Sequence, residues 1–306
     1  MIQSLEGKTA VLTGAGSGFG LECARLAATH GMKLVLVDVQ QDALDRVEAE
    51  LTAVGASVLA QKVDVSNAEQ MEGLAAAVHK RFGAPHLLFN NAGVISGGLV
   101  WESSVPDWEW VLGVNLWGVI HGVRVFVPMM LNAAARDASY RGHIVNTSSM
   151  AGLLALPNMG IYNTTKAAVV NFTETLFHDL NLVTEQIGTS LLCPYFVPTG
   201  IASSQRNRPE QLLASKPTAS QMIGQAMAEK AVESGKVTAS DIARKVFDAV
   251  HANQFYVFSH PDALGSVRSR MDGIVSGTNP ADPFLRRPDI ARRLRDELRA
   301  AVNSMP

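Results

Sequence analysis

The chain has 306 residues, of which 47% are hydrophobic and 18% charged, and its 26 Lys and Arg against 28 Asp and Glu give a formal net charge of −2. A chain of this length and composition can bury a large core, which excludes disorder for most of it. Its balanced charge supplies no basic surface for nucleic acid or for an anionic membrane, so we expect small neutral or mildly charged partners.

Short apolar runs alternate with longer helical patterns through the first 260 residues, as is typical of βαβ units. Near-continuous apolar runs such as 34–37 favour strands covered on both faces. We therefore predict an α/β fold with a doubly wound parallel seven-stranded sheet and helices on both faces. The expected strands are 9–12, 33–38, 57–63, 86–90, 143–147, 189–193 and 255–258, and the expected helices are about 19–30, 41–54, 67–82, 106–133, 161–184 and 239–252.

Glycines and two irregular segments complete this organisation. Gly31, Gly55, Gly83 and Gly188 stand where helix C-caps are expected. Residues 195–238 form an insertion, for which we expect a loop that acts as a substrate lid or is disordered. We expect residues 1–261 to be a single catalytic domain and 262–306 to be a C-terminal helical extension, packed on the body or on a neighbouring subunit.

The cysteines, the histidines and the apolar windows exclude several classes of protein. Cys23 and Cys193 lie far apart and outside any CxxC pattern, and the eight histidines show no HExxH or HxH spacing, so we expect reduced core cysteines and no metal site. The most apolar long window, 111–131, contains Asn115, His121 and Arg124, which argues against a membrane helix. The N-terminus does not have the layout of a secretory signal, and we expect a cytoplasmic protein.

A glycine-rich turn, TGAGSGFG at 13–20, follows the first expected strand. Such a turn allows close backbone approach, and the helix that follows offers unpaired N–H groups to a pyrophosphate. Taken alone, it could also be a packing feature. Its spacing departs from G-x-G-x-x-G, because Phe19 occupies the place of the third glycine when Gly14 is the first, and it fits T-G-x-x-x-G-x-G instead.

This turn resembles that of the short-chain dehydrogenase/reductase family, and the resemblance extends over roughly residues 7–260. It implies a Rossmann-type fold, a nicotinamide cofactor and hydride transfer. The further matching motifs follow in the family's order and are Asp38, Asp64-Val65, Asn90-Asn91-Ala92-Gly93, Asn115 in VNLWG, Ser149 in NTSSMAG, Tyr162 and Lys166 in YNTTK, and Pro194 with Thr199 in PYFVPT.

Tyr162 and Lys166 stand at i and i+4, on one face of a helix. Alone, this spacing also fits a surface pair, but among the other motifs it predicts a tyrosine acid/base whose pKa the ammonium lowers. The resemblance implies that Ser149, thirteen residues before Tyr162, binds the substrate oxygen, with Ser148 as a structural rival. It also implies that Asn115, inside an apolar helix, supports a proton relay through a water near Lys166.

The acidic residue at the end of the second expected strand decides between cofactors. Asp38 stands eighteen residues after Gly20, where a carboxylate accepts hydrogen bonds from a ribose and repels a 2′-phosphate. Neither Ser17 nor Val39 supplies a basic side chain, so NAD is favoured over NADP. The resemblance also implies that Asn90 helps to form the floor beneath the ribose. The cofactor-binding residues that it implies are Gly14, Ser17, Gly18, Phe19, Gly20, Asp38, Asp64, Val65, Asn91, Ala92, Gly93, Tyr162, Lys166, Pro194, Val197 and Thr199.

The substrate side shows one departure from the family pattern, because Tyr195 stands where most relatives have glycine after Pro194. It could form a wall of the substrate site or pack under the lid. The expected substrate-binding residues are Ser149, Leu153, Met159, Tyr195 and Phe196, in an apolar pocket. Arg206, Arg208 and Lys216 in the insertion could hold an anion or form a solvated lid face.

The sequence thus predicts an NAD-dependent oxidoreductase that interconverts a hydrophobic secondary alcohol and its ketone. The alternatives are an NADPH-dependent carbonyl reductase, an enoyl reductase, a sugar epimerase, and a non-catalytic dinucleotide-binding or scaffold protein. The helices at 106–133 and 161–184 carry more apolar residues than one face against a sheet needs; on the first they are Trp110, Val114, Phe126, Met129 and Met130. The resemblance implies that these helices meet across a two-fold axis in a homodimer or homotetramer, although the residues could also all pack within the subunit.

Overall fold

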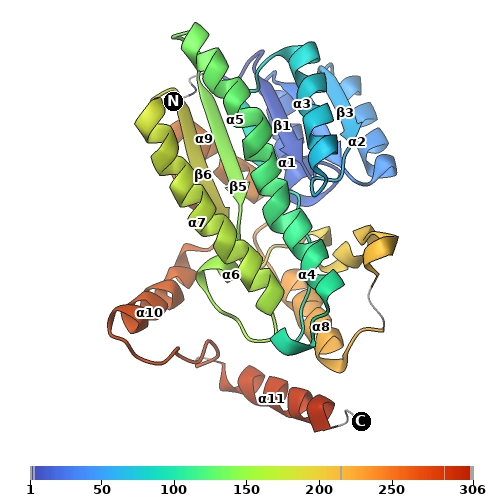
Figure 1. The fold of residues 1–306 in the computed structure, drawn as a ribbon, viewed down its shortest axis with the longest axis vertical. Helices are drawn as coiled ribbons and strands as arrows, with labels where there is room; N and C mark the ends of the chain where they lie inside the picture. Colours follow the sequence, from blue (N-terminus) through green and yellow to red (C-terminus); the bar gives the residue numbers. More distant parts are fainter. Residues whose placement is uncertain (1, 3, 214–215, 286, 304–306) are drawn as a thin grey trace.

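The computed structural model describes residues 2, 4–213, 216–285 and 287–303, and a seven-stranded sheet lies at its centre (Figure 1). The strand order is β3-β2-β1-β4-β5-β6-β7, and every neighbouring pair is parallel. The order reverses between β1 and β4, and this is the point at which such sheets bind ligands beyond the carboxyl ends of their strands. The predicted sheet is confirmed. Its strands are β1 (Thr9–Thr13), β2 (Lys33–Asp38), β3 (Val58–Lys62), β4 (Leu87–Asn90), β5 (Gly142–Thr147), β6 (Ile187–Cys193) and β7 (Tyr256–Phe258).

Helices cover both faces of this sheet because alternate strand residues point to opposite sides. Leu34 and Leu36 of β2 belong to one buried cluster, whereas Val35 and Val37 belong to another. Figure 1 shows α5 and α7 in front of the sheet and α9 behind it. The first cluster joins the strands to α1 (Gly18–Thr29), α2 (Gln41–Ala53) and α9 (Ala239–Ala252), and the second joins them to α3 (Ala68–Phe82), α5 (Gly118–Arg136) and α7 (Gly160–Val183).

Three of the four predicted helix-ending glycines have that role. Gly31, Gly55 and Gly83 follow α1, α2 and α3 with φ values of 70°, 88° and 79°. The prediction for Gly188 is wrong, because this residue lies inside β6. A Cβ there would stand 2.1 Å from Asn253 Oδ1, so close packing, and not a turn, requires the glycine.

The helix predicted at 106–133 contains a π-helical turn. It is divided into α4 (Val105–Leu112), the turn η2 (Gly113–Trp117) and α5. The whole stretch, Val105–Arg136, is long and apolar enough to cross a membrane by length and composition, but half of its most apolar window is buried inside the protein. The core helix of a domain has the same properties, and α5 packs against α3 and the sheet.

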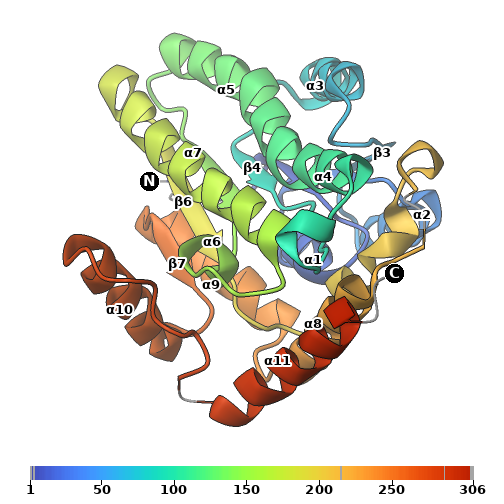
Figure 2. The same ribbon diagram turned by 60° about the horizontal axis from the view of Figure 1, so that its bottom comes forward.

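The 195–238 segment is mostly helical, and not the loop that the sequence predicts. It contains η3 (Gly200–Asn207), η4 (Glu210–Leu212) and α8 (Ala219–Glu233). The C-terminal extension contains η5 (Pro261–Ala263), α10 (Leu264–Val275) and α11 (Pro288–Asn303), and α11 runs back against α8 (Figure 2). Two short elements complete the fold, η1 (Val100–Glu102) and α6 (Met150–Leu153).

Candidate active site

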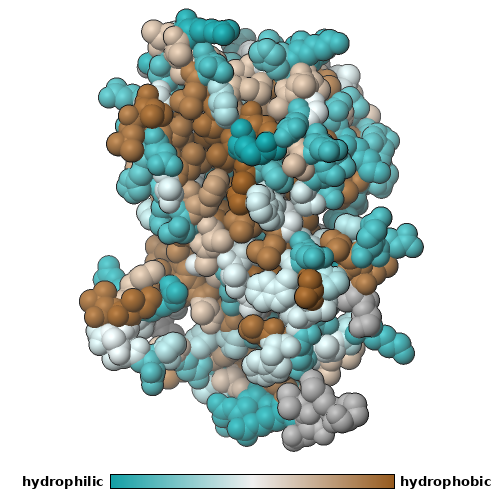
Figure 3. Space-filling view, in the orientation of Figure 1, coloured by the Kyte–Doolittle hydropathy of each residue, from teal (hydrophilic) through white to brown (hydrophobic). Residues whose placement is uncertain are grey.

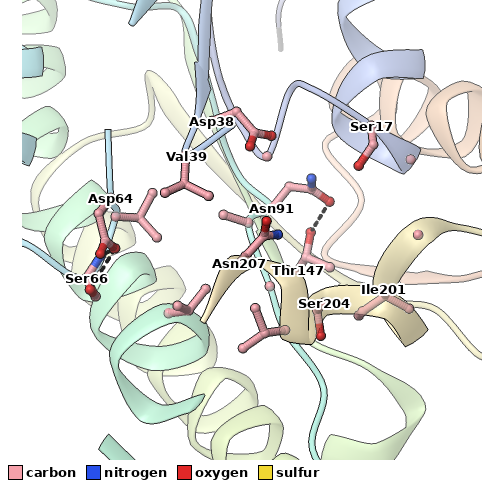
Figure 4. A pocket seen from close by; sticks show the side chains of 18 of the residues that line it. Ser17, Asp38, Val39, Asp64, Ser66, Asn91, Thr147, Ile201, Ser204 and Asn207 are labelled. Carbon is pink, nitrogen blue, oxygen red and sulfur yellow. Dashed lines mark hydrogen bonds between the residues drawn. The ribbon is translucent and has the colours of Figure 1, made fainter. Parts of the chain in front are cut away.

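A cleft of about 1210 Å³, including its open mouth, lies at the carboxyl ends of the central strands. Asp38 and Ser17 lie along one side of it, and Ile201, Ser204 and Asn207 of η3 lie along the other (Figure 4). The predicted site residues that line it are Gly14, Ser17, Gly18, Phe19, Asp38, Asp64, Val65, Asn91, Ala92, Gly93, Tyr162, Lys166, Pro194 and Thr199.

The glycine turn forms a cradle that side chains would fill. Gly14 has a φ of 67°, and a Cβ there would lie 3.1 Å from the Ala92 Cα atom. A Cβ on Gly16 would lie 2.9 Å from Asp38 Oδ2. Ser17 is the N-cap of α1 but makes no capping hydrogen bond through its side chain, so the first N–H groups of α1 are available to an anion. The cradle therefore fits the pyrophosphate of a dinucleotide.

Gly20 lies behind the cradle, against the backbone of Gly14. It does not line the cleft, and a Cβ on it would lie 2.1 Å from the backbone oxygen of Gly14. The glycine therefore allows α1 to pack directly against the turn. Gly20 thus helps to fix the shape of the cradle, and its predicted part in cofactor binding stays a prediction.

Asp38 closes the end of β2 beside this cradle. Its Oδ2 accepts a hydrogen bond from Gly16 N at 2.9 Å and its Oδ1 accepts one from Gln40 N at 3.0 Å. Two backbone donors thus fix the carboxylate at the edge of the cleft. Lys166 and Arg206 are the only Lys or Arg side chains that line the cleft in the described part of the chain.

Tyr162 and Lys166 lie together on α7 at the deep end of the cleft. Lys166 Nζ stands 5.7 Å from the centroid of the Tyr162 ring and donates to the Thr147 backbone oxygen at 2.9 Å. Burial lowers the pKa of Lys166 to about 8. Burial also raises the pKa of Tyr162 to about 12, although a hydrogen bond with Ser149 acts in the opposite direction. The expected lowering of the tyrosine pKa is therefore wrong for this structure, because desolvation outweighs the stabilisation of the phenolate.

The two neighbouring serines have different partners. Ser149 caps α6, where its Oγ accepts from Ala151 N at 3.1 Å and donates to the Pro194 oxygen at 3.3 Å, and it hydrogen-bonds Tyr162. Ser148 Oγ donates to the Lys166 backbone oxygen at 2.7 Å. Ser149 is therefore the hydroxyl beside the tyrosine, and Ser148 supports the helix that carries the lysine.

Asn115 occupies the π-helical turn and is fully buried. Its Oδ1 accepts from Val94 N at 2.8 Å and its Nδ2 donates to the Val94 oxygen at 2.9 Å. A Cβ on Gly93 would lie 3.4 Å from Asn115 Oδ1 and 3.6 Å from Lys166 Nζ, so the three residues converge. Asn115 does not itself line the cleft; it ties the loop after β4 to the helices beside Lys166.

Two residues assigned to cofactor binding from the sequence lie elsewhere. Asn90 donates through Nδ2 to Asn146 Oδ1 at 2.9 Å, and its Oδ1 lies 2.0 Å from where a Cβ on Gly122 would stand. Its side chain therefore faces α5 and does not form a floor beneath a ribose. Val197 is buried in the cluster that joins the sheet to α1 and α9, outside the cleft lining.

The expected substrate residues are divided between two clusters. Met159 packs with Tyr162, Ile95, Ile201 and Ala228 beside the tyrosine. None of the five expected residues, Met159 and Ser149 included, is in the lining of the cleft, which contains Ser148 instead. Leu153 and Tyr195 belong to a cluster that extends to β7 and α10, and Phe196 contacts the Tyr195 ring with a centroid distance of 4.3 Å. The substrate role of Leu153, Tyr195 and Phe196 stays a prediction; in this structure Leu153 and Tyr195 pack toward the tail, with Phe196 against Tyr195.

Sequence reasoning missed Thr13, although it opens the TGAGSGFG motif. Its Oγ1 accepts from Asn91 N at 2.8 Å and from Ala92 N at 3.0 Å, which joins the glycine turn to the loop after β4. It also missed Ser204, whose Oγ accepts from Ile95 N at 3.0 Å. The place of Thr13 in the motif was an available signal, whereas no local pattern marks Ser204.

Comparison with known proteins places these residues in a wider group. Residues 8–210 match the family model described as short chain dehydrogenase. A short chain dehydrogenase/reductase from Burkholderia phymatum, solved in complex with NAD, is 51% identical with a TM-score of 0.89, covering 92% of this chain and 99% of that one. A CLA biosynthesis dehydrogenase/reductase of Lactiplantibacillus plantarum is 32% identical over 91% of this chain and 97% of its own length. A C alpha-dehydrogenase of a Sphingobium species is 29% identical over 92% and 90%.

Proposed function

The chain belongs to the short-chain dehydrogenase family, and from this premise we propose that it is an NAD-dependent oxidoreductase that interconverts a hydrophobic secondary alcohol and its ketone. The observation that carries the proposal is the convergence of Tyr162, Ser149 and Lys166 beside a glycine cradle closed by Asp38. A non-catalytic dinucleotide-binding protein would have no need for the Ser149 hydroxyl beside Tyr162.

In this proposal Tyr162 holds and moves the proton at the substrate oxygen. Its hydroxyl would donate a proton to the carbonyl oxygen during reduction and take one from the alcohol during oxidation. Ser149, which already hydrogen-bonds the tyrosine, would hold the same oxygen. A bound nicotinamide supplies the hydride chemistry.

Lys166 and Asn115 would support this proton transfer. The Lys166 ammonium lies over the Tyr162 ring and would stabilise the phenolate that forms when the proton leaves. Asn115 holds the loop after β4 through both backbone groups of Val94. We propose that this fixed loop keeps a path for the proton beside Lys166.

The preference for NAD rests on Asp38. Its carboxylate is held by two backbone N–H groups at the edge of the cleft, where it would accept hydrogen bonds from a ribose and repel a 2′-phosphate. The neighbouring Val39 and Gln40 line the same part of the cleft and carry no positive charge. A solved relative in complex with NAD is consistent with this preference.

The substrate class rests on the side chains around Tyr162. Ile95, Met159, Ile201 and Ala228 pack with it, so a substrate held there would meet apolar groups. We propose an aryl or medium-chain substrate in place of a sugar. The 195–238 segment, which contributes Ile201 and Ala228, would act as the lid over it.

We also propose that the protein forms a homo-oligomer and that it is cytoplasmic. Trp110, Phe126 and Met130, which were predicted at an interface, are buried within the subunit. Other apolar residues remain on the face formed by α5 and α7 (Figure 3), and Leu182 is 84% exposed. We propose that this face forms the contact of a symmetric dimer or tetramer. Cys23 and Cys193 are free and buried, as suits a reducing compartment.

A panel of alcohols and ketones, followed by NADH absorbance, tests the proposal. We expect turnover with apolar secondary alcohols or their ketones and a higher kcat/KM with NAD(H) than with NADP(H). Preferred turnover of small polyols or sugars would overturn the substrate class. Binding of NADH without turnover of any member would favour a dinucleotide-binding role.

A further inference from the structure

Arg206 lies where the 195–238 segment meets the glycine turn. A Cβ on Gly18, at the start of α1, would lie 3.4 Å from the Thr199 Cβ atom, and a Cβ on Gly200 would lie 3.2 Å from Arg206 Nη2. All four residues line the cleft. Figure 4 shows η3, which carries Arg206, opposite the turn that carries Ser17. The guanidinium and the N-terminus of α1 therefore line the same cleft, with Thr199 and Gly200 between them.

The cleft has few positive charges with which to balance the charge of a pyrophosphate. Its lining contains three carboxylates, Asp38, Asp64 and Glu109, and two cations, Lys166 and Arg206. Lys166 donates to the Thr147 oxygen at the deep end, beside Tyr162. A dinucleotide brings a doubly charged pyrophosphate to the glycine turn, where the helix N-terminus provides only partial charge.

The Arg206 guanidinium is held by η3 through one nitrogen, Nη1, and in the part of the chain that the structure describes it is not paired with a carboxylate. Its Nη1 donates to the Gly200 oxygen at 3.0 Å and to the Ser203 oxygen at 2.7 Å, and within the described residues it forms no ion pair with a carboxylate. Arg208, two residues further along, is committed to Asp107 at 2.7 Å and to the Leu212 oxygen at 2.6 Å. Arg206 is thus the cation of η3 that faces the cleft without a counterion.

We propose that Arg206 binds the pyrophosphate of the dinucleotide and so holds η3 in place along the cleft. The inference rests on the proposed function insofar as a dinucleotide is the ligand. The guanidinium can form two parallel, charge-assisted hydrogen bonds to phosphate oxygens, which a lysine cannot reproduce. Because Arg206 and Ile201 belong to the same short helix, binding of the pyrophosphate by Arg206 would also hold Ile201 beside Tyr162.

Binding measurements on the full-length protein test this without any turnover. Calorimetry would compare ADP-ribose, which carries the pyrophosphate, with adenosine, which carries no phosphate. We expect Arg206→Gln to weaken ADP-ribose and NADH binding by about tenfold to a hundredfold and to leave adenosine binding unchanged. Arg206→Lys should be intermediate. Arg244→Gln, on α9 and outside the cleft lining, is the matched control and should bind all three ligands like the wild type.

Two results would overturn the inference while leaving the proposed function intact. One is that Arg206→Gln binds ADP-ribose within twofold of the wild type. The other is an equal loss of affinity for ADP-ribose and for adenosine, which would mean that Arg206 serves only to stabilise η3 through its hydrogen bonds to Gly200 and Ser203. Failure of the wild type to bind NADH or ADP-ribose would instead overturn the proposed function, and this inference with it.

Discussion

Asp107 and Arg208 form a buried ion pair, with 2.7 Å between Asp107 Oδ1 and Arg208 Nη1 and side chains that are 3% and 7% exposed. Asp107 belongs to α4, and Arg208 follows η3 in the 195–238 segment. Gln221 of α8 donates to the other carboxylate oxygen at 3.1 Å, and the Arg208 guanidinium lies over the Trp110 ring. The pair therefore joins one wall of the cleft to the segment that closes it.

Breaking this pair should open the 195–238 segment. Asp107→Asn leaves the Arg208 charge buried without its counterion, which typically costs about 3–5 kcal/mol. Limited proteolysis should then cut within 195–238 faster than in the wild type, and NADH should bind more weakly. Asp42→Asn is the matched control, because Asp42 pairs with Arg46 on an exposed surface, where an ion pair contributes little to stability.

The contrast between the two variants decides this prediction. Equal proteolysis rates and equal loss of stability in Asp107→Asn and Asp42→Asn would mean that the buried pair does not hold the segment.

Lowering the pH should also weaken this ion pair, as Asp107→Asn does. Burial raises the pKa of Asp107, but hydrogen bonds from Ser104 and Arg208 outweigh it and leave the pKa below the ordinary value of 3.8. The stability due to the pair is thus present above that value and is lost as the pH falls through the lowered pKa.

Tyr162→Phe should remove the acid/base and keep the packing. We expect turnover to fall at least about a hundredfold while NADH binding stays close to that of the wild type, since the ring remains. Tyr140→Phe is the matched control: Tyr140 is also buried, but its hydroxyl donates to the Pro85 oxygen away from the cleft. That variant should lose stability and keep its turnover. More than a tenth of wild-type turnover in Tyr162→Phe, with chemistry limiting, would exclude the role proposed for the tyrosine.

Asp38→Ala should weaken NAD binding and lower the ratio of kcat/KM for NAD(H) to kcat/KM for NADP(H). The wild type should favour NAD(H) at least tenfold in kcat/KM, because the carboxylate repels a 2′-phosphate. Adding Val39→Arg should turn the preference toward NADP. Asp64→Asn is the control, because the Asp64 carboxylate accepts from Ser66 N at 2.9 Å beside the cleft and should affect affinity for both cofactors alike. A wild-type preference for NADP(H) would contradict the argument from Asp38.

Most of the cradle could be predicted from the sequence because local spacing determines it. The glycine turn, Asp38 at the end of β2 and the Tyr162–Lys166 pair each depend on residues that are close along the chain. Gly188 shows the limit of that reasoning. A glycine after a long helix suggests a cap, but its need here comes from Asn253, which is distant in sequence.

The rest depended on contacts that no short pattern records. Tyr195 follows a motif residue, yet it packs toward His260 and the α10 helix, which the sequence could not place. The Asp107–Arg208 pair joins residues about a hundred positions apart. The pKa of Tyr162 likewise depends on how completely the fold buries the ring, and burial is a property of the assembled structure.

Lys166→Met should make the protein more stable at neutral pH while abolishing turnover. Burial lowers the pKa of Lys166 from 10.5 to about 8, so the folded state binds this proton more weakly than the unfolded state. The penalty is therefore complete below about pH 8, decreases as the pH rises, and is gone above about 10.5. Allowing for the lost hydrogen bond to Thr147, we expect a gain of about 1–2 kcal/mol at pH 7. Thermal unfolding of both proteins across this range, with the exposed Lys80→Met as control, measures it. A difference that fails to shrink above pH 8, or a Lys166→Met protein less stable than the wild type at pH 7, would mean that the buried ammonium is stabilised by its surroundings and is not held there at a cost to the fold.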